Sequence, residues 1–134
     1  MYGKSSIMES APIRELRWVG RSLADLKEFP EDVQDVLGYA LHVAQTGGKH
    51  PSAKPLRGDP AFTGAGVLEV VDDYDGDTYR AVYTVRYGDV VYVLHCFQKK
   101  AKHGIQTPPR EIDLVKRRLK AAATDYATRK AGLV

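Results

Sequence analysis

Residues 89–126 read DVVYVLHCFQKKAKHGIQTPPREIDLVKRRLKAAATDY, and the rest of the chain is organised around this stretch. It opens with an apolar run typical of a buried strand and then passes through three lysines. A short connector containing Gly and Pro leads into a pattern typical of an amphipathic helix. A buried strand that carries cations to its exposed end, braced by the helix that follows, suits an anionic ligand.

The composition of this 134-residue chain favours one domain, long enough to bury roughly two thirds of its unfolded surface. No apolar run approaches the roughly 20 residues that a membrane span needs. Residues 1–12 lack the apolar core of a signal peptide, which predicts a cytoplasmic protein without a membrane partner. Cys96 is the only cysteine, so neither an intrachain disulfide nor a cysteine-based zinc site is expected.

The charges are unevenly distributed along the chain. The formal net charge is only +3, but acids crowd residues 72–77 while bases crowd residues 99–103 and 110–120. Separation of this kind favours a polyanionic partner over a general role in solubility.

The order of the periodic segments predicts an α+β fold. Residues 13–19 alternate as a strand with Leu16 and Trp18 facing inward, and two helices follow before Gly47. Residues 49–66 predict a loop in which Leu56 contacts the core. A three-stranded antiparallel meander comes next, to which the first strand can add. Its strands are expected at residues 67–71, 78–87 and 90–98.

The last segment predicts a helix with Thr107 as its N-cap and Pro108 at its first position. The domain is expected to span residues 13–126. A loose N-terminal tail, 1–12, and a C-terminal tail, 127–134, would flank it.

The sequence predicts no metal site or cofactor. The acids of residues 72–77 fail the spacing of a calcium loop, because Thr78 and Thr84 stand where Gly and Glu would be needed, so a solvated hairpin turn is favoured. The four histidines include no pair at helical i, i+4 spacing. His95, on a strand face with Val93 and Phe97, is interpreted as a hydrogen-bonded, partly buried histidine. His103 is the better candidate for proton transfer.

The most suggestive cluster is basic. Lys99, Lys100, Lys102 and His103 follow the buried strand, and the turn at residues 88–89 brings Arg80 of the neighbouring strand close to residues 93–98. Cations gathered in one place favour a phosphate ligand. The alternative is a solvated lysine run that protects a strand end from edge pairing.

The segment FQKKAKHGIQTPPREIDLVKRRL, residues 97–119, resembles the phage-derived branch of the RelE/HigB-like toxins of bacterial type II toxin–antitoxin systems. The earlier LRG (56–58), LEV (68–70) and YRAVY (79–83) match in the same order, so the resemblance covers about residues 13–123. The C-terminal positions that carry it are Phe97, Lys99, Lys100, Gly104, Ile105, Thr107, Pro108, Glu111, Ile112, Asp113 and Leu114.

This resemblance implies a fold, an activity and partners. The fold is an N-terminal strand and a helical hairpin packed on a curled antiparallel sheet, with a C-terminal helix. The activity is metal-independent, ribosome-associated cleavage of mRNA, which inhibits translation. The partners are mRNA, the ribosome and a cognate antitoxin, often of the helix-turn-helix type.

The resemblance also implies roles for individual residues. Arg80 would bind the phosphate bidentately, and Lys99 and Lys100 would stabilise the charge of the phosphorane. Lys99, Lys100 or Lys102 would act as the general base, with His103 as an alternative acid or base. In one departure, Glu69 stands about where the family carries a lysine. Further contacts to RNA are expected from Lys54, Arg57, Arg86, Arg110 and Arg117.

Two alternatives remain open at the level of sequence. The related ParE proteins share the fold and poison DNA gyrase by binding, without catalysis. A phage-derived binding protein that lacks catalytic activity would carry the same sequence pattern. The basic cluster around Arg80 favours the nuclease over the ParE-like poison.

Overall fold

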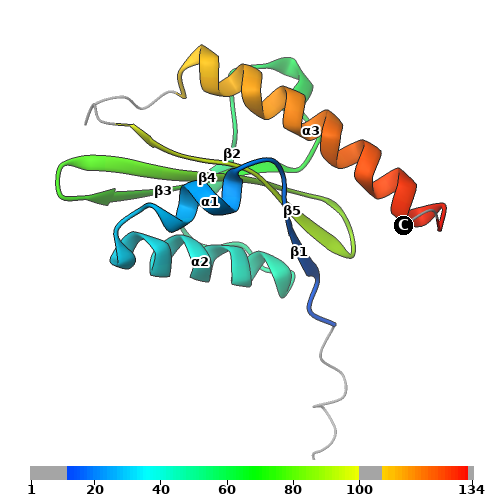
Figure 1. Cartoon of the computed structure of the whole chain (residues 1–134), viewed down its shortest axis with the longest axis horizontal. Helices are drawn as coiled ribbons and strands as arrows, with labels where there is room; N and C mark the ends of the chain where they lie inside the picture. Colours follow the sequence, from blue (N-terminus) through cyan, green and yellow to red (C-terminus); the bar gives the residue numbers. More distant parts are fainter. Residues whose placement is uncertain (1–11, 100–106, 133–134) are drawn as a thin grey trace, which may run out of the picture.

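The structure is a computed structural model, and it describes residues 12–99 and 107–132. A short N-terminal strand is followed by two helices, a long antiparallel region and a C-terminal helix (Figure 1). The elements are β1 (Glu15–Trp18), α1 (Ser22–Lys27), α2 (Glu31–Gln45), β2 (Ala53–Pro55), the 3₁₀ turn η1 (Pro60–Phe62), β3 (Val67–Tyr74), β4 (Asp77–Tyr87), β5 (Val90–Lys99) and α3 (Pro109–Lys130).

Five strands form one open mixed sheet in the order β1-β5-β4-β3-β2. β1 runs parallel to β5, with Glu15 opposite Val90, and every other pair is antiparallel. The predicted meander is therefore β3-β4-β5, and the N-terminal strand adds to it beside β5 as expected. The α+β architecture with a helical hairpin and a C-terminal helix is confirmed.

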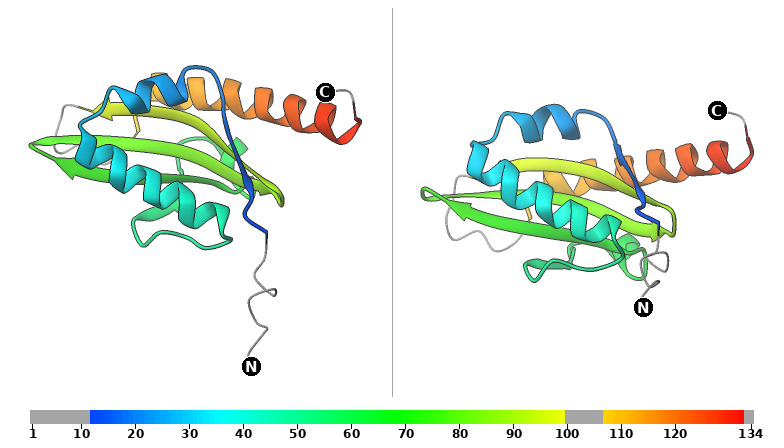
Figure 2. Two further views of the ribbon diagram at one scale, coloured as in Figure 1. Left: turned by 60° about the horizontal axis from the view of Figure 1, so that its bottom comes forward. Right: turned by 90° about the horizontal axis from the view of Figure 1, so that it is seen from below.

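One face of the sheet packs against α1 and α2 (Figure 2). This face is apolar because every second residue of β4 points towards the helices, and these residues are Tyr79, Ala81, Tyr83 and Val85. Leu16 and Trp18 of β1 pack against the same cluster, as predicted. α2 contributes a stripe of buried residues to this cluster, Val33, Leu37, Ala40, Leu41 and Ala44.

The opposite face packs against α3. Ile112, Val115 and Ala122 supply the buried side of that helix. Leu56 is 4% exposed and belongs to the same cluster, so its predicted contact with the core is confirmed. The α3 face also holds buried polar side chains, which the α2 face largely lacks.

A bulge in β5 changes which residues share a face. Tyr83 pairs with Val93, whereas the adjacent Val82 pairs with His95, so Leu94 is an additional residue in β5. Val93 therefore packs towards α2, while Leu94 lies on the α3 side. The prediction that His95 shares a face with Val93 is wrong, because the bulge interrupts the alternation between them.

Several predicted boundaries differ from the structure. The segment expected to be a loop contains β2, which adds to β3. Pro108, not Thr107, is the N-cap of α3, and the Thr107 hydroxyl bonds to residues of the sheet instead. The predicted tail 127–134 is helical as far as Lys130, and its last turn makes ion pairs from Arg129 to Glu15 and from Lys130 to Asp89.

Within residues 12–99 and 107–132, no helix is both long and apolar enough to cross a membrane.

Candidate functional site

The candidate site lies on the α3 face of the sheet, towards the end where β5 finishes. Arg80 of β4 pairs with Phe97 of β5, inside the range predicted from the turn at residues 88–89. Two residues further along, Thr78 pairs with Lys99. Because cross-strand partners and every second residue share a face, Arg80 and Lys99 emerge on the same side of the sheet.

Arg80 is almost completely buried and is held by two neighbours. Its side chain is 3% exposed, and its Nη1 donates to Glu69 Oε1 at 3.1 Å. The same nitrogen donates to Thr107 Oγ1 at 3.2 Å, and that hydroxyl in turn donates to Glu69 Oε1 at 3.2 Å. The three side chains therefore form a closed hydrogen-bonded cycle, here called the Arg80 triad.

The Arg80 triad joins three parts of the chain. Glu69 comes from β3, Arg80 comes from β4, and Thr107 lies just before α3. Glu69 is 7% exposed on its side chain, so both charges of the ion pair are removed from water. Such a pair is weakly screened, and either partner would be strongly destabilising if it were left alone. The guanidinium predicted to bind phosphate is thus already engaged by a carboxylate.

The remaining predicted catalytic residues are placed only in part. Lys99 is partly buried at the end of β5, and its backbone carbonyl accepts a hydrogen bond from the Thr78 hydroxyl at 3.2 Å. Lys100, Lys102 and His103 lie outside the described residues.

A second polar cluster lies under the first half of α3. His95 Nε2 is 2.6 Å from Glu111 Oε1, and Arg118 Nη1 is 3.4 Å from His95 Nδ1. Since Arg118 can only donate, Nδ1 acts as the acceptor and Nε2 carries the proton that is donated to Glu111. Burial lowers the pKa of His95 more than Glu111 raises it, which agrees with a neutral ring.

This second cluster fastens α3 to the bulge of β5. Arg118 Nη1 also donates to the carbonyl of Leu94 at 3.0 Å, and the His95 ring stacks on Phe97. Gly20 leaves room for the guanidinium, because a Cβ at that position would lie 2.9 Å from Arg118 Cζ. The interpretation of His95 as a hydrogen-bonded, partly buried histidine agrees with its 5% exposure and its bond to Glu111.

The residues predicted to contact RNA are all exposed, but they do not form one patch. Lys54 lies on β2 directly opposite Glu69, which places it beside the Arg80 triad. Arg86 lies at the far end of β4, about 20 Å along the strand from Arg80. Arg57 follows β2, and Arg110 and Arg117 lie on α3. Lys54 is therefore the member of this set with the best-defined relation to the candidate site.

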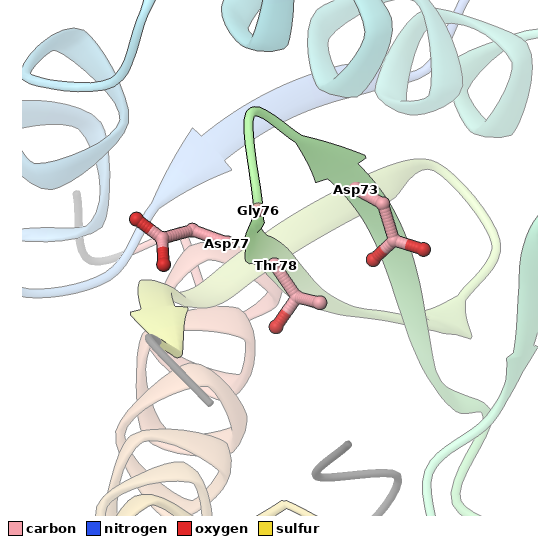
Figure 3. A pocket seen from close by; sticks show the side chains of 4 residues that line it. All are labelled: Asp73, Gly76, Asp77 and Thr78. Atoms are coloured by element: carbon pink, nitrogen blue, oxygen red, sulfur yellow. The ribbon is translucent and has the colours of Figure 1, made fainter. Parts of the chain in front are cut away.

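The acidic segment 72–77 forms the tip of the predicted hairpin, but β3 continues to Tyr74, beyond its predicted end at residue 71, and only residues 75 and 76 form the turn. Asp75 and Gly76 both have positive φ angles, 51° and 87°, as a tight two-residue turn between antiparallel strands requires. Figure 3 shows the carboxylates of Asp73 and Asp77 pointing to different sides of the hairpin tip. In the part of the chain that the structure describes, no three His, Cys, Asp or Glu side chains gather to hold a metal ion.

Sequence reasoning did not place Glu69, Thr107 or Glu111 in the site. Glu69 was noted only as a departure from a family pattern, although an acid between Leu68 and Val70 in a strand with a buried face needs a partner of opposite charge. The two-residue turn after Tyr74 fixes the register of β3 on β4, so this signal could have brought Glu69 close to Arg80.

Comparison with known protein families identifies the family of the chain. Residues 24–120, more than half of the chain, match the family described as phage-derived protein Gp49-like (DUF891). The chain therefore belongs to this phage-derived family, which is a RelE-like, toxin-like family of toxin–antitoxin systems. No curated protein and no solved structure matches the chain.

Proposed function

We propose that this protein is the toxin of a type II toxin–antitoxin system and that it cleaves mRNA on the ribosome without a metal ion. The observation that carries the proposal is the position of Arg80 and Lys99 on one face of the sheet, at the end where β5 leads into the basic connector. Membership of the Gp49-like family supports the assignment as a toxin.

The chemistry requires three contributions from the protein. In metal-free cleavage the ribose 2′-hydroxyl attacks the adjacent phosphorus, so a base must remove its proton and an acid must protonate the leaving 5′-oxygen. Cations must stabilise the additional negative charge of the phosphorane. Arg80 and Lys99 supply positive charge, and Lys99, Lys100, Lys102 and His103 remain the candidates for proton transfer.

The proposal also includes partners and a place of action. An enzyme that cuts mRNA on the ribosome acts in the cytoplasm. A toxin of this type requires a cognate antitoxin, for which a helix-turn-helix protein is the expected class.

A second function, binding without catalysis, is favoured by one specific observation. Arg80 is 3% exposed on its side chain and is engaged by Glu69, so its guanidinium is partly neutralised. In a protein that only binds its target, this ion pair would be a structural feature of the sheet. A gyrase poison of the ParE kind belongs to this class.

Induced expression in a bacterial host separates these functions. Wild-type protein, Lys99→Gln and Lys120→Gln would be compared for growth and for new 5′ ends in mRNA. Lys99 is partly exposed at the candidate site, whereas Lys120 is exposed on α3. Each substitution removes one positive charge, so Lys120→Gln is the matched control. We expect arrest and cleavage from wild type and Lys120→Gln, with both strongly reduced for Lys99→Gln.

Other results would redirect the assignment. Growth arrest with intact mRNA and accumulated gyrase–DNA complexes would indicate a ParE-like poison. Normal growth with full-length folded protein would indicate a binding protein without catalytic activity.

A further inference from the structure

We propose that Glu69 is an internal anion that competes with phosphate for Arg80 and thereby sets the affinity and selectivity of the site for RNA. The inference rests on the proposed function for the identity of the ligand, but the competition itself concerns any phosphate. It assigns Glu69 as a positioning residue that acts through Arg80.

Hydrogen bonding gives the first step. Arg80 Nη1 carries two N–H groups, and its two acceptors in the Arg80 triad are Glu69 Oε1 and Thr107 Oγ1. A phosphate oxygen that approaches this nitrogen must therefore displace one of them. Glu69 contacts this nitrogen through a single carboxylate oxygen, so a phosphate oxygen that binds here competes with Glu69 for the same donor.

Charge gives the second step. Arg80 and Glu69 are 3% and 7% exposed on their side chains, so water and salt screen their surroundings weakly. A phosphate bound at Arg80 would lie within a few ångströms of a carboxylate of the same sign. Repulsion of this kind lowers affinity even when the hydrogen bonds to the guanidinium are good.

Thr107 gives the third step, because it restrains the carboxylate. Its hydroxyl donates to Glu69 Oε1 and accepts from Arg80, so Glu69 cannot turn away from Arg80 without losing this bond as well. Thr107 lies immediately before the N-cap of α3. Release of Glu69 is thus coupled to the position of the chain at the start of this helix.

Selectivity for a polyanion follows from these steps. A single phosphate ion brings one anionic group to this face, and that group meets the repulsion of Glu69 directly. An RNA strand can contact Lys99 and Lys54 as well, since Lys99 lies on the same face and Lys54 pairs directly with Glu69. Glu69 therefore excludes free phosphate more strongly than it excludes RNA.

The test compares purified full-length wild type with Glu69→Gln and with Asp73→Asn as a matched control. Asp73 lies on the same strand and face as Glu69, four residues further on and exposed, and its substitution removes the same charge. One probe is a labelled oligoribonucleotide with 2′-O-methyl riboses, which can bind but cannot be cleaved through the 2′-oxygen. The other is inorganic phosphate, followed by its effect on Tm.

We expect Glu69→Gln to bind the oligoribonucleotide about tenfold more tightly than wild type does. Asp73→Asn should change affinity by less than about threefold, because its charge is exposed and screened. Inorganic phosphate should raise the Tm of Glu69→Gln and leave the Tm of wild type unchanged. Equal behaviour of Glu69→Gln and Asp73→Asn with both probes would overturn the proposal.

Further outcomes separate this inference from the proposed function. If induced wild type cleaves mRNA but Glu69→Gln behaves like Asp73→Asn, the competition is wrong and the nuclease assignment stands. If mRNA stays intact and no variant binds RNA, while phosphate stabilises only Glu69→Gln, the nuclease assignment is wrong and the competition stands.

A variant that does not fold is covered by a second substitution. Glu69→Asp keeps the charge but shortens the side chain by one methylene, which withdraws the carboxylate from Arg80 and Thr107. Its phosphate-induced rise in Tm should be larger than that of wild type or Asp73→Asn. It should be smaller than the rise expected of Glu69→Gln, which lacks the competing carboxylate. A response identical to wild type would contradict the proposal.

Discussion

The two faces of the sheet differ in what they bury. The face under α1 and α2 is built from aliphatic and aromatic side chains of β3, β4 and β5. The face under α3 buries Glu69, Arg80, Thr84 and His95 among its apolar residues. Burial of charge costs free energy unless partners compensate it, so the two faces cannot serve stability equally well. The α2 face contributes mainly apolar burial, whereas the α3 face combines apolar burial with buried charges that need partners.

The largest effect that would test this comparison is expected at Arg80. Arg80→Ala leaves the Glu69 carboxylate buried without its cation, which should cost about 3–5 kcal/mol in the free energy of unfolding. Urea denaturation would measure this loss. The double variant Arg80→Met with Glu69→Leu should recover most of the stability, because both charges are removed together. If the single and double variants were equally unstable, the ion pair would not explain the loss.

Leu37→Ala should give the next largest effect, on the α2 face. Leu37 is fully buried in the stripe of α2, and its truncation should lower the free energy of unfolding by about 3 kcal/mol through lost burial and a residual cavity. Chemical denaturation followed by circular dichroism would measure it. The folded fraction of this variant should still bind RNA, since Leu37 packs on the α2 face and does not touch the α3 face.

Tyr83→Phe should act in the opposite direction, by about 1 kcal/mol of stabilisation. Tyr83 is completely buried on the α2 face, and among the described residues its hydroxyl finds no hydrogen-bond partner. Burial without a partner also raises the pKa of this phenol to about 12. Loss of stability in Tyr83→Phe, measured by the midpoint of urea unfolding, would show that the hydroxyl is satisfied in solution.

The smallest expected effect is a pH dependence that originates at His95. Burial lowers the pKa of His95 in the folded state from its ordinary value of 6.5, so the unfolded chain binds this proton first as the pH falls. The contribution of His95 to stability is therefore complete at pH values above the ordinary pKa of 6.5. It decreases as the pH falls from there towards the pKa of the folded state.

Unfolding measured near pH 7.5 and near pH 5.5 would reveal this dependence, because imidazoles titrate in this range and carboxylates largely do not. His95→Gln should reduce the loss of stability on acidification, because it removes the buried imidazole that must be protonated. An unchanged loss in His95→Gln would assign the effect to other groups.

The sequence predicted the segments that have a clear period and missed those that depend on tertiary pairing. The alternation of β4 and the stripe of α2 were readable because one face of each is buried. Residues 53–55 lie among prolines and show no period, so the sequence predicts a loop there. Only their pairing with β3 makes them a strand. The bulge at Leu94 left no signal in the sequence, and it changed which side His95 faces.

The candidate site was predicted in part for the same reason. Arg80 was placed near the end of β5 because a tight turn fixes the register of β4 on β5. The burial of Arg80 was not predicted, since it depends on how α3 covers the sheet. Its bond to Glu69 depends on the register of β3 on β4, which the turn after Tyr74 fixes. Local spacing predicts that Thr107 caps the helix, but its hydroxyl hydrogen-bonds to the buried side chains of Arg80 and Glu69 instead.

The parallel pairing of β1 with β5 has a consequence for the order in which the protein can be completed during synthesis. Glu15 can pair with Val90 only after residue 90 has been synthesised. The apolar stripe of α2 likewise packs against strands that are synthesised after it. Contacts between such distant parts of a chain form late and slow the folding of small domains. Most of the chain must therefore leave the ribosome before α1 and α2 are covered, so an incomplete chain exposes apolar surface and has no assembled Arg80 triad.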